Sequence, residues 1–176
     1  MSGGGGFPFG WLPPDRKSPR FMNRTWTQLA WPLAILAFCA WQATDLVVAW
    51  RHSPFDRLGW VAFLIWLAPA ALEWVRSPGS REPALPYLLA ALGLAFIGRL
   101  LDINAPRSLA LGCALAAFVT PTGLRLLWAL SAVAWMPVMG WVLRDLPPVA
   151  VGGLRCLLAL AGVAAWYYRP VRLQPA

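Results

Sequence analysis

The sequence predicts an all-α integral membrane protein, a polytopic helix bundle with about six transmembrane helices. Two observations carry this prediction. Hydrophobic residues make up 59% of the 176 positions and charged residues only 12%, about half the charged fraction of an average soluble domain. The apolar residues also gather in six runs separated by short polar segments, and about 20 apolar residues in helix span the roughly 30 Å of hydrocarbon in a bilayer.

The composition also excludes other classes. The chain is too apolar for a disordered protein, and three cysteines are too few for a disulfide-stapled scaffold. Its 12 Trp and 17 Pro are typical of membrane helices with interfacial aromatic rings and tolerated kinks. The net charge of +8 comes from residues between the apolar runs, which indicates positive-inside topology rather than nucleic-acid binding. The predicted location is the plasma (inner) membrane of a bacterium, with the lipid bilayer as the main partner.

The chain divides into a tail, a membrane domain and a second tail. Residues 1–26 are basic and rich in glycine and proline, and nothing in them is periodic enough to predict a helix. We expect a flexible cytoplasmic tail there. The transmembrane domain is expected over residues 27–168, and a short cytoplasmic tail over residues 169–176.

The first apolar run extends from about Leu29 to Trp50. We interpret it as a retained helix rather than a signal peptide. A cut after Ala43 would put the bulky Trp41 at the third position before the bond, where a small residue is needed. Pro32 falls in the first turns of this run, where proline is tolerated.

The second run, Leu58 to Val75, carries tryptophans near both ends, as an aromatic belt requires, and Pro69 should kink it. The third covers about residues 84–101. The fourth, about residues 106–119, is only about 21 Å long as a helix. It either extends over residues 120–121, lies in a thinned bilayer or is re-entrant.

The fifth run, residues 124–143, should kink at Pro137. The sixth covers about residues 149–168 and ends in Trp166, Tyr167 and Tyr168, which are expected to anchor it at the interface. With the N-terminus inside, nine lysines and arginines lie in inside segments and five in outside loops. This count predicts that both termini are cytoplasmic. The five outside residues are Arg51, Arg57, Arg99, Arg107 and Arg144.

Residues able to do chemistry are sparse. Cys39, Cys113 and Cys156 each fall inside an apolar run without paired spacing, which predicts packing groups rather than a disulfide, a metal site or a nucleophile. His52 is the only histidine, and no nucleophile elbow, zinc-protease motif or phosphate-binding loop occurs. No catalytic residue, metal or cofactor is therefore predicted.

Acidic and basic residues share the three outer loops, and these loops form the candidate polar site. Its functional interpretation is one outer-face site. The members of that site are Arg51, His52, Asp56, Arg57, Arg99, Asp102, Arg144 and Asp145. The alternative is a set of hydrated loop residues with ion pairs worth under about 1 kcal/mol each.

Arg155 is the most unusual residue, because it lies about 10 Å along the sixth helix. At the bilayer centre an arginine costs about 2.5–3.5 kcal/mol to insert. Snorkelling to the interface would offset part of this cost, and an acidic partner inside the bundle would offset more. The expected partner is Asp45 or Asp102. Both a functional role and a purely structural pairing remain open.

Residues Trp41 to Trp74 read WQATDLVVAWRHSPFDRLGWVAFLIWLAPAALEW. This segment resembles the N-terminal region of the exosortase/archaeosortase family, polytopic membrane proteins thought to act as cysteine transpeptidases on C-terminal sorting tails. In that family a helix ends in a turn containing Asp and Trp. A short aromatic-Ser-His-Gly loop and an aliphatic helix with a proline follow. Phe55, Asp56, Arg57, Leu58 and Gly59 occupy the loop here, without the Ser-His-Gly itself. Residues 135–148 (WMPVMGWVLRDLPP) are similar to a later helix of the family.

The resemblance covers about residues 27–150 and stops before the family's active site. That site needs a cysteine in an Ala-Cys-Ser-Gly type motif, then an arginine, then a histidine or arginine. Cys113 (LGCAL) and Cys156 (LRCLL) lack the motif. The resemblance implies a shortened, non-catalytic exosortase-like subunit or scaffold in cell-envelope protein sorting, which packs against another membrane protein. The alternatives are a membrane-embedded cysteine transpeptidase- or protease-like enzyme using Cys156 with Arg155, and a small transporter component.

Overall fold

The computed structural model describes residues 20–76, 82–119, 123 and 125–168, with side chains of the first helix described from Leu29 onward. Within these residues every regular element is a helix, which confirms the predicted all-α class. The elements are α1 (Arg20–Gln42), α2 (Asp45–His52), α3 (Gly59–Arg76), α4 (Leu85–Leu100), α5 (Asn104–Ala117), α6 (Arg125–Leu130), the 3₁₀ helix η1 (Ser131–Trp135), α7 (Pro137–Val142) and α8 (Pro148–Tyr167).

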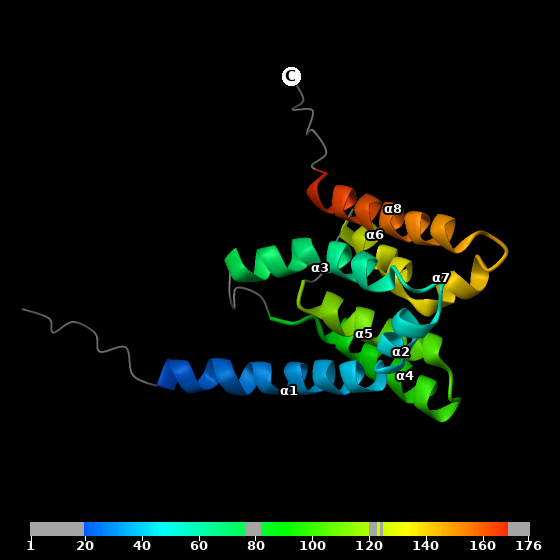
Figure 1. Cartoon of the computed structure of the whole chain (residues 1–176). Coiled ribbons are helices and arrows are strands. Elements are labelled where there is room, and N and C mark those ends of the chain that lie inside the picture. Colours follow the sequence, from blue (N-terminus) through cyan, green and yellow to red (C-terminus); the bar gives the residue numbers. More distant parts are fainter. Residues whose placement is uncertain (1–19, 77–81, 120–122, 124, 169–176) are drawn as a thin grey trace, which may run out of the picture.

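The helices run back and forth between two ends of the molecule (Figure 1). α1 leads to the end that carries α2, α7 and the start of α8, and α3 and α8 both run away from it. We call this end the outer end, following the predicted topology, and the opposite end the inner end.

The number of full spans differs from the sequence prediction. In the described part of the chain, α3 and α8 are each long and apolar enough to cross a membrane, and the α1–α2 pair, bent by 40°, makes a third if it counts as one span. Two or three helices therefore qualify, rather than six. They support membrane association, while the remaining runs are broken or short for identifiable reasons.

The first run begins earlier and ends earlier than expected. α1 starts at Arg20, so residues 20–26 of the predicted tail are helical, and Pro32 lies well inside the helix instead of in its first turns. The sequence between Arg20 and Trp31 contains no glycine or proline to interrupt a helix. The rest of that tail, residues 1–19, and the predicted tail at residues 169–176 lie outside the described residues.

Pro137 divides the fifth run completely, so the expected kink is a break. Met136 has extended backbone angles (φ −79°, ψ 145°), because the ring of a following proline disfavours the helical conformation. The chain tightens into η1 before this point and restarts as α7 after it. Pro69, in contrast, lies inside α3, which stays one helix from Gly59 to Arg76.

The fourth run forms α5, the central helix of the fold. Only Asn104 and Leu109 of this helix are exposed, because α1, α4, α6 and η1 pack around it. Its alanines and its one glycine let these neighbours approach closely. A Cβ added at Gly112 would lie 3.4–3.6 Å from side chains of η1 and Met136. α5 pairs with α4 as a helical hairpin, whose open end is closed by a 2.9 Å hydrogen bond from Ala84 N to Ala117 O.

The distribution of side chains suits a lipid surface. Val149, Leu157 and Phe96 are 85%, 64% and 68% exposed, whereas Arg155 is completely buried. Exposed apolar side chains in such number are unusual for a soluble monomer. On α3 the exposed indoles of Trp60 and Trp74 mark its two ends, as predicted for an aromatic belt.

Candidate functional site

Arg155 of α8 is held entirely inside the bundle. Its Nη2 pairs with Asp56 Oδ1, and its Nη1 donates a 3.0 Å hydrogen bond to the carbonyl oxygen of Ala134. The side chain of Asp56 is itself only 9% exposed. The prediction that Arg155 has an acidic partner in the bundle is confirmed, but the choice of Asp45 or Asp102 is wrong, because both of these carboxylates pair with Arg107.

The break at Pro137 explains why Arg155 is needed. In an unbroken helix the carbonyls of Ala134 and Trp135 would accept bonds from the N–H groups four residues later. Here the N–H of Met139 donates to Met136 O instead. Arg155 supplies a donor to Ala134 O, and the indole Nε1 of Trp50 supplies one to Trp135 O at 3.1 Å. Side chains thus satisfy the carbonyls that the break leaves free, as backbone at membrane depth requires.

Gly140 makes room for this ion pair. A Cβ at that position would lie 2.6 Å from Asp56 Oδ1 and 3.0 Å from Arg155 Nη2. Asp56 is positioned from the other side by the turn into α3, where its carbonyl accepts a 2.7 Å bond from the N–H of Gly59. The pair is therefore enclosed between the start of α3, α7 and α8.

Arg107 forms a second cluster at the start of α5. Its Nε donates to Gly98 O at 3.1 Å, its Nη1 contacts Asp45 Oδ2 at 3.1 Å and its Nη2 contacts Asp102 Oδ1 at 2.6 Å. Asp102 occupies the turn between α4 and α5 with φ +53°, a conformation that aspartate tolerates better than most residues. Arg107 therefore ties this turn to the start of α2.

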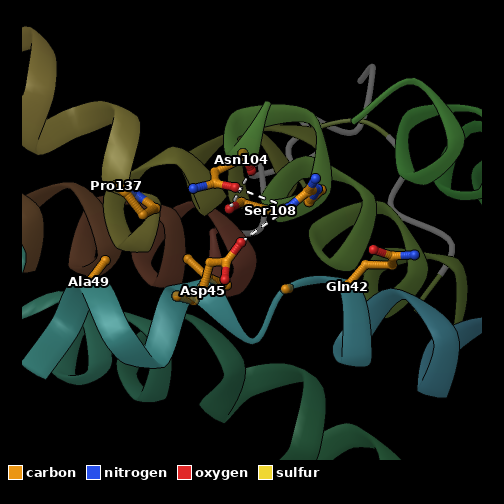
Figure 2. A pocket seen from close by; sticks show the side chains of 9 residues that line it. Gln42, Asp45, Ala49, Asn104, Ser108 and Pro137 are labelled. Atoms are coloured by element: carbon orange, nitrogen blue, oxygen red, sulfur yellow. Dashed lines mark hydrogen bonds and ion pairs between the residues drawn. The ribbon is translucent and has the colours of Figure 1, made fainter. Parts of the chain in front are cut away.

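A cavity of about 50 Å³ lies beside the Arg107 cluster, where the α1–α2 break, the start of α5 and Pro137 of α7 meet (Figure 2). Its lining residues are Gln42, Ala43, Asp45, Leu46, Ala49, Asn104, Arg107, Ser108 and Pro137. Ser108 Oγ donates to Asn104 O at 3.0 Å. The volume suits a water molecule or a methyl group, since a site for benzene needs about 150 Å³.

The predicted outer-face site is divided by the fold. Asp56 turns inward to Arg155, and Asp102 belongs to the Arg107 cluster. The other members are exposed and form no ion pair among the described residues. These are Arg51, His52, Arg57, Arg99, Arg144 and Asp145. Arg107 belongs to the polar arrangement as well. From the sequence it was counted as a residue outside the membrane and was not included among the candidate site residues.

Aromatic residues form the core between α3, α6, η1 and α8. The rings of Trp66 and Trp128 stack with 4.5 Å between centroids, and each indole Nε1 donates to the other residue's carbonyl, at 2.8 and 2.7 Å. Trp166 packs edge-on against Trp128, and Arg125 lies 4.5 Å above its ring. Trp166 is only 7% exposed, so it belongs to the core rather than to the interfacial anchor predicted for it.

The described residues offer little for catalysis. No group of three or more metal-ligating side chains gathers among them. Cys156 is a free, half-buried thiol on α8, while His52 is exposed at the end of α2. The strongest polar arrangements are thus the two arginine clusters. Arg155 donates to the carbonyl of Ala134 at the helix break, and Arg107 adds a second donor to Gly98 O, which also accepts a 3.0 Å bond from the N–H of Ile103.

Fold and site together define an α-helical protein with two or three helices able to cross a membrane and two arginine clusters near one end. Comparison with known protein families, with curated proteins and with solved structures found no match to this chain. The resemblance to exosortases therefore stays a prediction.

Proposed function

We propose that this protein is a non-catalytic, multi-pass subunit or scaffold of the plasma membrane, exosortase-like in its helices, that serves cell-envelope protein sorting by packing against another membrane protein. Both termini lie in the cytoplasm in this proposal. The two or three helices able to cross a membrane anchor the chain there, and the shorter helices pack against them.

One observation carries the non-catalytic part of the proposal. The deepest charged group, Arg155, already has a carboxylate partner in Asp56 and a carbonyl partner in Ala134. A charge that a structural contact neutralises in this way is not free to activate a neighbouring thiol. Cys156, next in the chain, would need such a group or a base within hydrogen-bond reach to act as a nucleophile.

The packing part of the proposal rests on the surface. Large apolar side chains are exposed on α3, α4 and α8, including Leu64, Leu89 and Leu157 at 54%, 59% and 64%. Lipid tails or another transmembrane helix would cover such side chains without cost, and helices in membranes associate by this kind of close contact.

Deletion of the gene in its own bacterium tests the proposal. We expect envelope proteins with C-terminal sorting tails to accumulate unprocessed, measured by mass spectrometry of their C-terminal peptides. A plasmid-borne wild-type copy should restore processing, and so should Cys156→Ser. Normal processing in the deletion strain would contradict the sorting role.

The Cys156→Ser copy separates the scaffold from the enzyme alternative. Failure of this variant to restore processing, with wild-type amounts of protein in the membrane, would assign the activity to the Cys156 thiol. Topology is tested separately by reporter fusions. Fusions at either terminus should report a cytoplasmic location, and fusions after Arg57 or Asp145 an external one.

A further inference from the structure

The turn that leads from α2 into α3 rests on α7 and on the start of α8. A Cβ added at Gly140 of α7 would lie 2.6 Å from Asp56 Oδ1, and one added at Gly152 of α8 would lie 2.5 Å from Leu58 Cδ1. The link from α7 to α8, residues 143–147, joins the same two helices. The turn and the link therefore lie beside each other at the outer end of the molecule (Figure 1).

Exposed arginines occur in both of these segments. Arg57 in the turn and Arg144 in the link form no ion pair among the described residues, and Arg51 at the end of α2 is a third such arginine. The carboxylate of Asp56 is bound inside the bundle, so Asp145 is the one exposed acid beside them. Three arginines against one aspartate give this surface a net positive charge.

Exposed aromatic and aliphatic side chains continue from these arginines along the two spanning helices. Trp60 and Leu64 are exposed on α3, one helical turn apart on the same face. Trp141 of α7 and Val149 and Leu157 of α8 are exposed as well. Indoles favour the headgroup level of a bilayer and aliphatic side chains favour its interior. The order of cations, indoles and aliphatic groups thus matches the layers of a phospholipid.

Arg125 provides a contrast, because protein groups already satisfy its charge. It pairs with Glu73 at 3.1 Å and lies 4.5 Å above the ring of Trp166. The guanidinium groups of Arg57 and Arg144 have no such acidic partner among the described residues. Their charge is available to an anion at the membrane surface.

We propose that a surface formed by Arg51, Arg57, Arg144, Trp60 and Trp141 binds an anionic phospholipid. The phosphate contacts the arginines, whose N–H groups match phosphate oxygens, and the acyl chains lie along the exposed side chains of α3 and α8. The net positive charge of the surface favours an anionic headgroup over a zwitterionic one. This binding does not depend on the sorting role.

The experiment uses the purified full chain in detergent, with phosphatidylglycerol or phosphatidylcholine of identical acyl chains added. Native mass spectrometry measures how much of each lipid the protein retains. We expect stronger retention of phosphatidylglycerol, and 1 M ammonium acetate should abolish this preference because it screens exposed charges. Equal retention of the two lipids, or a preference that salt leaves unchanged, would overturn the proposal. Displacement of the lipid by inorganic phosphate at the same concentration would overturn it as well, because it would indicate a site for a free ion.

Two double variants test the residues. Each arginine near an anionic headgroup contributes about fivefold in affinity, so Arg57→Gln with Arg144→Gln should weaken phosphatidylglycerol binding about 25-fold and leave phosphatidylcholine binding unchanged. Arg76→Gln with Arg99→Gln is the matched control, since it removes the same charge from two exposed arginines elsewhere. This control should bind as the wild type does. An equal loss in the control, or wild-type binding by the first variant, would overturn the assignment of these arginines. The lipid and salt comparisons on the wild-type protein decide the preference even if a variant fails to fold.

Discussion

The two arginine clusters use the same chemical unit in different surroundings. Each arginine pairs with aspartate and donates to a backbone carbonyl, Arg155 to Ala134 O and Arg107 to Gly98 O. The side chain of Arg155 is 0% exposed and that of its partner Asp56 9%, whereas the partners of Arg107, Asp45 and Asp102, are 49% and 92% exposed.

The difference in exposure sets what each cluster contributes. Removing one partner of a buried pair leaves an uncompensated charge, which costs about 3–5 kcal/mol. Carboxylates that already contact water can hydrate when their partner is lost, and exposed pairs contribute only about 0–1 kcal/mol. The Arg155 cluster therefore holds the fold together at its broken helix, while the Arg107 cluster mainly fixes a turn.

The largest effect is expected for Arg155→Ala. It leaves Asp56 charged in the core and Ala134 O without its donor, so the free energy of unfolding in detergent should fall by about 3–5 kcal/mol. The yield of monodisperse protein should fall with it. Unchanged yield and stability would show that Asp56 reaches water and that the pair is not buried in the membrane.

A double variant sharpens this result. Arg155→Met with Asp56→Leu removes both charges and keeps similar volume, so most of the lost stability should return. A residual loss of about 1–3 kcal/mol is expected from the unsatisfied carbonyl of Ala134. A double variant no more stable than Arg155→Ala would contradict the pairing.

Gly140→Ala is expected to have the next largest effect. The new methyl group would meet Asp56 Oδ1 at 2.6 Å and push the ion pair apart, at a cost of about 1–3 kcal/mol in unfolding free energy. Gly153→Ala is the matched control on α8, because nothing lies within 4 Å of its added Cβ. The control should be neutral or stabilising by up to about 1 kcal/mol. If the two substitutions had equal effects, the close contact between the new methyl group and Asp56 would not be the cause of the lost stability.

Arg107→Ala should destabilise less than Arg155→Ala, by about 1–3 kcal/mol, because the charge-assisted bond to Gly98 O is lost while Gly98 O keeps its 3.0 Å bond from the N–H of Ile103. Arg99→Ala serves as the control, since Arg99 is an exposed residue of the same hairpin and surface substitutions usually change stability by under about 0.5 kcal/mol. Denaturant titrations of Arg107→Ala, Arg155→Ala and Arg99→Ala in one detergent measure the three losses of stability. A loss as large as that of Arg155→Ala would mean that exposure does not separate the clusters.

The smallest effect is expected for Asp102→Asn. Asparagine tolerates the positive φ of this turn, so the substitution removes only the charge of a 92% exposed carboxylate. The unfolding free energy should fall by under about 1 kcal/mol, and 1 M salt should reduce the difference further, because it screens exposed charges. If 1 M salt left this difference unchanged, the ion pair between Asp102 and Arg107 would be shielded from the solvent, although the Asp102 side chain is 92% exposed.

Several features of the site follow from the sequence and others do not. The depth of Arg155 predicts a buried acidic partner, because an unpaired charge there is costly. The identity of that partner is not predictable, because Asp45, Asp56 and Asp102 all belong to outer loops. Sequence spacing gives the depth of a residue along its helix, but not which neighbour its side chain meets.

The lengths of the apolar runs likewise did not show which helices contact lipid and which lie inside the fold. A run of apolar residues predicts a helix but not whether a lipid tail or another helix surrounds it. α5 is the shortest of the six runs and lies at the centre, because small side chains favour close contact on all sides. Trp128 and Trp135 of the fifth run and Trp166 are likewise buried in the core, whereas Trp141 of the same run is 70% exposed.

The sequence by itself determined the helical class, the approximate positions of the apolar runs, a distortion of the helix at Pro137 and the need to neutralise Arg155. These follow from hydropathy, proline geometry and the cost of a buried charge, which are properties of single residues and near neighbours. Only the tertiary structure decided that Asp56 is the partner, that Arg107 joins two turns and that the helix breaks completely at Pro137. Such pairings depend on how helices distant in the chain rotate and pack, and a linear sequence does not specify that rotation.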